Sequence, residues 1–114
     1  MHPEFKLWIE NEDGEQIIGE GLMQLLKKIE ETGSINRASD RLDMSYRTAW
    51  GKIEKIENRL GEELLERKTG GAGVGGSELA EKGRKLMDKY IRFKNSVARD
   101  IKEEFENTFE EYIQ

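Results

Sequence analysis

Two segments of the sequence carry the side chains best suited to bind a polyanion. Residues 45–50 open an amphipathic segment whose outer side presents Arg47, Lys52 and Lys55. Residues 68–77 form a basic, glycine-rich stretch further along the chain. Guanidinium and ammonium groups bind phosphate oxygens, and an arginine can also bind a guanine edge through two hydrogen bonds. A cationic helix followed by a flexible loop therefore predicts contact with DNA.

The glycine-rich stretch also permits other interpretations, which its surroundings disfavour. Residues 71–76 formally match G-x-G-x-x-G, but a dinucleotide fold needs a second parallel strand, and a single helix follows instead. A P-loop needs a lysine directly before Ser77, and none stands there. The remaining alternatives are an unstructured linker and a DNA-binding wing. Arg67, Lys68 and Thr69 favour the wing, because the following glycines let backbone N–H groups approach phosphates closely.

Residues for enzymatic or metal chemistry are scarce in this sequence. It has no cysteine, and its one histidine is His2, close to the terminus. Thiolate nucleophiles, thiolate zinc sites and histidine acid–base chemistry are therefore not expected. The paired acids at 103–104 and 110–111 lie on an exposed helix with no histidine beside them, so they do not predict catalysis. We expect neither an enzyme nor a cofactor or metal site.

The composition fits one domain with an uneven charge distribution. The 114 residues carry a net charge of −5. Residues 100–114 hold six acidic residues and one lysine, whereas residues 34–60 hold six basic and four acidic residues. The field over the middle of the chain can therefore be positive although the total is negative. No apolar run has the length of a membrane span and no leader is present, so we expect a cytoplasmic protein without membrane contact.

The elements that must position the cationic side chains follow from periodicity and capping residues. Alternating apolar residues around a turn at 11–14 predict a β-hairpin over 4–18. Apolar residues at helical spacing predict a first helix over 20–31, ended by Gly33. Ser34 then caps a second helix over 35–41, and Ser45 caps a third that ends at Gly61. Within the helical region 20–60, residues 34–60 thus form a helix-turn-helix.

The third helix separates an apolar side from a cationic one. Its predicted inner side comprises Tyr46, Ala49, Ile53, Ile56 and Leu60, with Trp50 on the shoulder of the core. In such helices the N-terminal side chains read base edges, and others hold phosphates. Arg47 suits guanine and Thr48 suits a thymine methyl, while the Tyr46 hydroxyl could reach a phosphate. The residues predicted to bind DNA are Ser34, Arg37, Ser45, Tyr46, Arg47, Thr48, Lys52, Lys55, Lys68, Thr69, Gly70 and Gly71.

The rest of the chain predicts a wing and a long helix. Residues 64–79 read as two short strands around the glycine-rich stretch, and residues 80–113 as one helix. So small a body cannot cover the whole apolar stripe of that helix, so its distal part should pack against a second copy. The predicted dimer interface is Tyr90, Phe93, Val97, Ile101, Phe105, Phe109 and Tyr112. Residues 1–114 then form a single α+β domain, mainly α: a winged helix-turn-helix with an N-terminal β-hairpin, a glycine-rich wing and a long C-terminal dimerisation helix.

The two cationic segments resemble the N-terminal DNA-binding domain of the ModE-type molybdate-responsive transcriptional regulators. In that family the recognition helix begins Ser-Tyr-x-x-Ala-Trp, and this chain has Ser-Tyr-Arg-Thr-Ala-Trp from Ser45. The family's wing reads roughly Thr-Gly-Gly-x-Gly-Gly-Gly-Gly, and this chain has Thr-Gly-Gly-Ala-Gly-Val-Gly-Gly from Thr69. Residues 32–35, 65–67 and 79–83 are similar to further family motifs. The wider group includes LysR-type regulators, from which the glycine wing distinguishes this family.

The resemblance implies a sequence-specific regulator that binds double-stranded DNA as a homodimer. The third helix would enter the major groove, and the wing would contact the backbone or the minor groove. In full-length members a separate C-terminal region binds molybdate. The sequence ends at Gln114, so no small-molecule effector is expected in it. One alternative stays open, a winged helix that binds protein instead of DNA, which the net charge of −5 favours.

Overall fold

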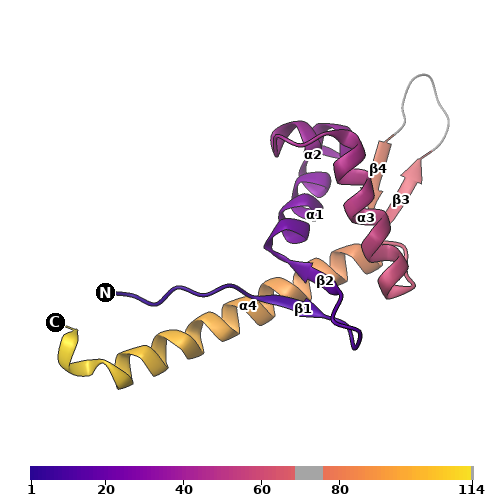
Figure 1. The fold of residues 1–114 in the computed structure, drawn as a ribbon. Coiled ribbons are helices and arrows are strands. Elements are labelled where there is room, and N and C mark those ends of the chain that lie inside the picture. The colour runs from indigo at the N-terminus through magenta and orange to yellow at the C-terminus, as the bar shows by residue number, and fades with distance from the viewer. Residues whose placement is uncertain (69–75, 114) are drawn as a thin grey trace.

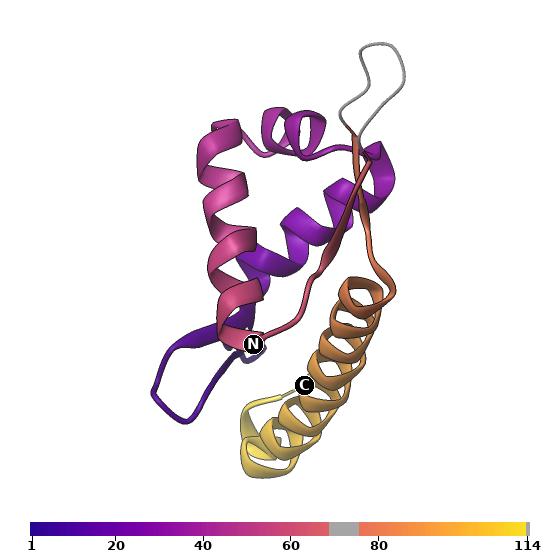
Figure 2. The same cartoon turned by 90° about the vertical axis from the view of Figure 1, so that its right-hand side faces the viewer.

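The structure, a computed structural model, describes residues 1–68 and 76–113, without the side chains of residues 67, 68 and 77. Helices α1, α2 and α3 form a compact body, a long helix lies along one side of it, and each of two hairpins borders the body (Figures 1 and 2). The elements in chain order are β1 (Trp8–Glu10), β2 (Gln16–Gly19), α1 (Glu20–Thr32), α2 (Ile35–Arg41), α3 (Tyr46–Leu60), β3 (Leu65–Lys68), β4 (Gly76–Leu79), α4 (Glu81–Thr108) and a 3-10 turn (Glu110–Tyr112).

The N-terminal hairpin is antiparallel and shorter than the sequence predicts. Ile9 pairs with Ile18, and the register shifts between Ile9 and Glu10. The side chain of Asn11 organises the turn, because its Oδ1 accepts hydrogen bonds from the backbone N–H of Asp13 at 3.0 Å and of Glu15 at 2.9 Å. The predicted hairpin over 4–18 loses its first residues because the segment before Trp8 has no strand partner and runs beside α4 instead (Figure 1).

Capping residues next to the helices set where the three helices of the body begin or end. Gly33 and Gly61 adopt left-handed conformations with φ of 76° and 70°, and each donates its N–H to a carbonyl four residues earlier. Ser34 and Ser45 cap α2 and α3 through their hydroxyls. Helix α1 lies at the centre of the core, where Leu25, Leu26 and Ile29 are fully buried. The predicted order and capping of these helices are confirmed.

The base of the second hairpin is bound tightly to the start of α4. Strands β3 and β4 pair antiparallel, with Leu65 opposite Leu79. The Ala80 N–H donates to the Leu64 carbonyl at 2.9 Å. One turn into α4, Gly83 lies so close that a Cβ there would stand 2.3 Å from the same carbonyl oxygen. Only glycine permits this approach, which fixes the direction in which α4 leaves the hairpin.

Helix α4 has 28 residues and extends well beyond the body (Figure 1). The principal extents of the molecule are 64 × 31 × 23 Å. The helix ends at Thr108 and a 3-10 turn follows, so the predicted continuation to residue 113 is wrong. Glu110 and Glu111 disfavour a longer helix, because acidic side chains are unfavourable at the negative C-terminal end of a helix dipole.

Candidate nucleic-acid interface

Helix α3 presents an open polar face opposite its packed side. Ala49, Ile53 and Ile56 are buried against the body. The side chains of Arg47, Thr48, Lys52 and Lys55 are exposed, as predicted. Arg47 and Lys55 are eight positions apart in the sequence, so they stand about two turns apart on one side of the helix.

The cations on and beside this face have no acidic partner within the described residues. No carboxylate there lies within 4.0 Å of the charged groups of Arg37, Arg47, Lys52 or Lys55, although other cations of the chain do form ion pairs. Although Glu54 is exposed on the same helix, these four cations outnumber it and can make the local potential positive despite the acidic total. They are therefore available to phosphate oxygens.

The serines at the two helix starts hold the backbone in place for the cations. Ser34 Oγ accepts from the N–H of Arg37 at 3.0 Å. Ser45 Oγ accepts from the N–H of Thr48 at 3.1 Å and donates its own proton to Thr48 Oγ1 at 2.9 Å. The Thr48 methyl group and hydroxyl proton stay free to contact a base. Among the predicted contact residues, the two serines thus have an observed role as caps.

The position of Tyr46 departs from the predicted arrangement of α3. The helical wheel placed its ring on the inner side, but the residue is 51% exposed. Helical side chains lean toward the N-terminus of their helix, so a side chain in the first turn projects past the core. About half of the surface of Tyr46 is therefore open to solvent. Trp50 is half-buried and packs against the core, in line with the prediction.

The wing is described only at its base. Strand β3 runs toward the end of the molecule that carries α2 and the start of α3, and β4 runs back from that end, in both views (Figures 1 and 2). Of the predicted wing contacts, the side chain of Lys68 and residues Thr69, Gly70 and Gly71 lie outside the described residues.

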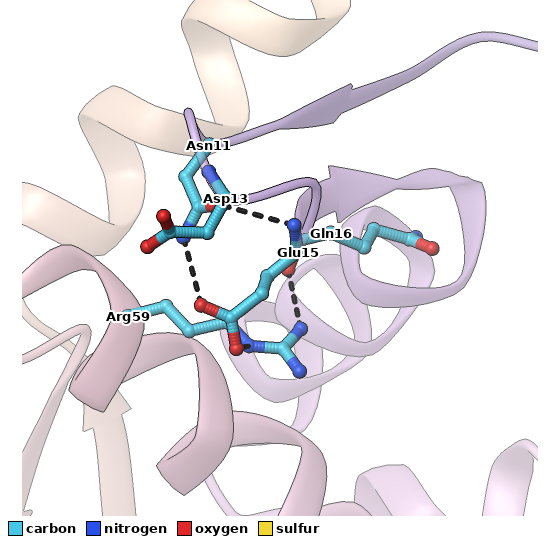
Figure 3. Close-up of polar contacts among 5 residues, drawn as sticks. All are labelled: Asn11, Asp13, Glu15, Gln16 and Arg59. Atoms are coloured by element: carbon cyan, nitrogen blue, oxygen red, sulfur yellow. Dashed lines mark hydrogen bonds and ion pairs between the residues drawn. The ribbon is translucent and has the colours of Figure 1, made fainter.

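Arg59, a cation near the end of α3, turns toward the N-terminal hairpin. Its Nη1 donates to the Gln16 carbonyl at 2.7 Å, and its Nε lies 3.3 Å from Glu15 Oε2 (Figure 3). Asn11 Nδ2 donates to the other oxygen of Glu15 at 3.1 Å. Arg59 thus ties the N-terminal hairpin to the end of α3. No short-range signal reveals this contact, because 43 residues separate the two partners.

The predicted dimer face divides between the chain's own core and open surface. Tyr90 is only 2% exposed and its hydroxyl donates to the Leu7 carbonyl at 2.9 Å, so it belongs to the core of the single chain. Val97, Ile101 and Phe105 are half-buried. Phe93, Phe109 and Tyr112 are exposed, and the Phe109 ring lies 5.2 Å from the ring of Phe105. An apolar face therefore continues beyond the body, partly covered at Val97, Ile101 and Phe105 and exposed at its aromatic end.

Within the described residues, no group of three or more histidine, cysteine or acidic side chains is placed to hold a metal ion. In the same part of the chain, no helix combines the length and apolarity that a membrane span requires.

Residues 21–84 match the family described as bacterial regulatory helix-turn-helix proteins, lysR family. The molybdenum transport protein ModE of Azotobacter vinelandii is 40% identical over 68 residues, which are 60% of this chain and 25% of that protein. The transcriptional regulator ModE of Yersinia pestis is 45% identical over 67 residues, which are 58% of this chain and 25% of that protein. The chain thus spans about a quarter of the length of these curated relatives.

Two solved protein–DNA complexes contain similar folds. The DNA-binding domain in the CbnR_DBD–DNA complex superposes with a TM-score of 0.58 at 23% identity, covering 73% of this chain and 90% of that chain. The domain in the complex of BenM_DBD with catB site 1 DNA superposes with a TM-score of 0.53 at 22% identity, covering 69% of this chain and 82% of that chain. The predicted winged helix-turn-helix fold is confirmed.

Proposed function

Because this chain belongs to the lysR family of bacterial regulatory helix-turn-helix proteins, we propose that it regulates transcription by binding a specific double-stranded DNA site. The observation that carries the proposal is the open face of α3, where cations without acidic partners follow a serine-capped N-terminus. This combination suits a recognition helix in the major groove. The chain would act without catalysis, at chromosomal DNA in the bacterial cytoplasm.

The proposed contacts divide by chemistry. Arg47, in the first turn of α3, binds a guanine edge through two hydrogen bonds, and Thr48 contacts a thymine methyl group. Lys52 and Lys55 lie further along the helix and hold phosphates, as does Arg37 from α2. Ser34 and Ser45 support these contacts as caps, and Tyr46 offers its exposed hydroxyl to a phosphate. The wing, with Lys68, Thr69, Gly70 and Gly71, contacts the adjacent backbone or minor groove.

The partly uncovered apolar face of α4 supports binding as a homodimer. Phe93, Val97, Ile101, Phe105, Phe109 and Tyr112 form the proposed interface. A two-fold dimer requires a two-fold related DNA site, with half-sites about 34 Å or a multiple of that apart. The ModE relatives support a place among regulators of that type. The matched residues make up only a quarter of those proteins, so the proposal concerns the DNA-binding part that they share with this chain.

The test uses fluorescence anisotropy with a labelled duplex selected from a random pool by the wild-type protein. Competitor-resistant binding with a steep salt dependence is the expected result. Arg47→Ala should weaken the free energy of DNA binding by about 1–3 kcal/mol and relax the sequence preference at one base position. Lys55→Ala should lower the slope of log affinity against log salt concentration by about one unit and weaken binding to all duplexes alike. Arg92→Ala, an exposed arginine on α4, is the control and should bind as the wild type does.

Equal and weak binding to selected and scrambled duplexes would contradict the proposal. The protein-binding alternative would then explain the open face of α3 better. Unchanged affinity and preference in Arg47→Ala would overturn the assigned docking of α3 but leave DNA binding itself intact.

A further inference from the structure

A glycine occupies the middle of the open face of α3. Gly51 lies inside the helix, four residues after Arg47 and four before Lys55, and it is exposed. Residues four apart on a helix stand on one side of it. Glycine is the poorest helix former after proline, because the free backbone loses more conformational entropy there than that of any other residue. Its presence at this position therefore calls for a compensating reason.

Within the described residues, the chain supplies no such reason. A Cβ built on Gly51 would have no atom within 4 Å, in contrast to Gly83, whose Cβ would strike a backbone carbonyl. The backbone of Gly51 is not left-handed, in contrast to the capping glycines Gly33 and Gly61. An alanine would thus fit the fold at position 51 and improve the helix. The described residues thus leave the side where Arg47 and Lys55 project as the place where a glycine brings a benefit.

We propose that Gly51 is a position of close approach, where the missing side chain lets the backbone of α3 lie against the wall of the major groove. This inference rests on the proposed function and refines it. Arg47 and Lys55 each stand about 6 Å along the helix axis from Gly51, so DNA held by both passes directly over it. A shorter distance between helix and DNA lets Arg47 reach a base edge. A side chain at position 51 would keep the helix away.

The test compares folding and DNA binding in the same variants. Gly51→Ala and Gly51→Gln both introduce good helix formers, so the melting temperature should rise by about 3–6 °C. Affinity for the selected duplex should fall about tenfold for alanine, since overpacking a contact is unfavourable, and further for glutamine. Asn95→Ala, an exposed site on α4, is the matched control. It should also raise the melting temperature while affinity stays unchanged.

Two results would overturn the inference. Wild-type affinity in a more stable Gly51→Ala protein would show that nothing approaches the helix at this position. A lower melting temperature would show that Gly51 serves the fold itself. Neither result depends on whether the proposed function holds, because that question is settled by specific binding of the wild-type protein to its selected duplex.

Discussion

The two halves of α4 carry the same apolar periodicity and meet different surroundings. In residues 81–91, here the proximal half, Gly83, Met87 and Tyr90 are buried in the chain's own core. In residues 92–108, the distal half, no residue is fully buried. Beside the distal half runs the N-terminal arm, residues 1–7, whose Met1, Pro3 and Phe5 line a cavity of about 300 Å³ together with Ala98, Ile101 and Phe105.

The difference shows what helical periodicity can specify. A stripe of apolar residues at steps of three and four indicates that a face will be covered, but not by which chain. The proximal half meets β4 and α1, so its cover is intramolecular. The distal half extends past the body, and its aromatic residues remain for a partner. Substitutions in the two halves should therefore change different measured quantities.

The largest effect is expected in the proximal half, from Gly83→Ala. The added methyl group would stand 2.3 Å from the Leu64 carbonyl oxygen, which is backbone and cannot move alone. We expect a loss of about 2–4 kcal/mol in the free energy of unfolding, measured by urea denaturation. Lys85→Ala, on the same half and exposed, should change it little. A loss below about 1 kcal/mol would mean that α4 is not fixed at this contact.

In the distal half, replacing Phe105 and Phe109 together by alanine should act on assembly. The two rings lie tilted against each other outside the core, so the free energy of unfolding of the isolated chain should change little. The dimer should become weaker by about 2 kcal/mol, so that its dissociation constant, measured by analytical ultracentrifugation, rises about 30-fold. Asn107→Ala on the same half provides the control. If the wild-type protein stays monomeric at high concentration, the proposed dimer interface is wrong.

Tyr90→Phe tests the junction between the halves. The variant keeps the ring in the core and removes the hydrogen bond from the hydroxyl to the Leu7 carbonyl. A loss of about 1 kcal/mol in stability is expected. Hydrogen exchange should also show faster opening of the N-terminal arm in this variant. If the arm exchanges at the wild-type rate, it is held by contacts other than Tyr90.

The smallest effect concerns the ion pair at the start of the distal half, where Lys94 Nζ lies 2.6 Å from Glu20 Oε2. The hydrogen bond between them lowers the pKa of Glu20 below its ordinary 4.5 and raises the pKa of Lys94 above its ordinary 10.5. Stabilisation is therefore full between these two values. It is lost as pH falls through the lowered pKa of Glu20 or rises through the raised pKa of Lys94.

Both side chains of this pair are partly exposed, so screening keeps its contribution small. Glu20→Gln should lower stability at pH 7 by less than about 0.5 kcal/mol. The difference from the wild type should shrink as pH falls below 4.5 and disappear once the pH lies below the lowered pKa of Glu20, which thermal melts across pH can follow. A difference that persists in acid would point to a packing role for the Glu20 side chain.

The sequence predicted the elements whose causes are local. Ser34, Gly33, Ser45 and Gly61 act within four residues of their own positions, and the helices that they bound are confirmed. Placements that depend on distant segments were not accessible. The core position of Tyr90 needs Leu7, 83 residues away, and the turn of Arg59 toward the N-terminal hairpin needs the residues around Gln16. The exposure of Tyr46 was missed for another reason, because a helical wheel ignores where a helix begins.

The continuous rod of α4 has a mechanical consequence. Its 28 residues span about 42 Å, and after Gly83 the helix contains neither glycine nor proline to act as a hinge. If two copies join at the C-terminal end of α4, each helix holds its DNA-binding α3 at a distance from the joint. A tilt of about five degrees at the joint would then displace α3 by roughly 3–4 Å, close to the rise of one base pair. The bending stiffness of α4 would thus limit how accurately the two α3 helices of a dimer can align with their half-sites on one duplex.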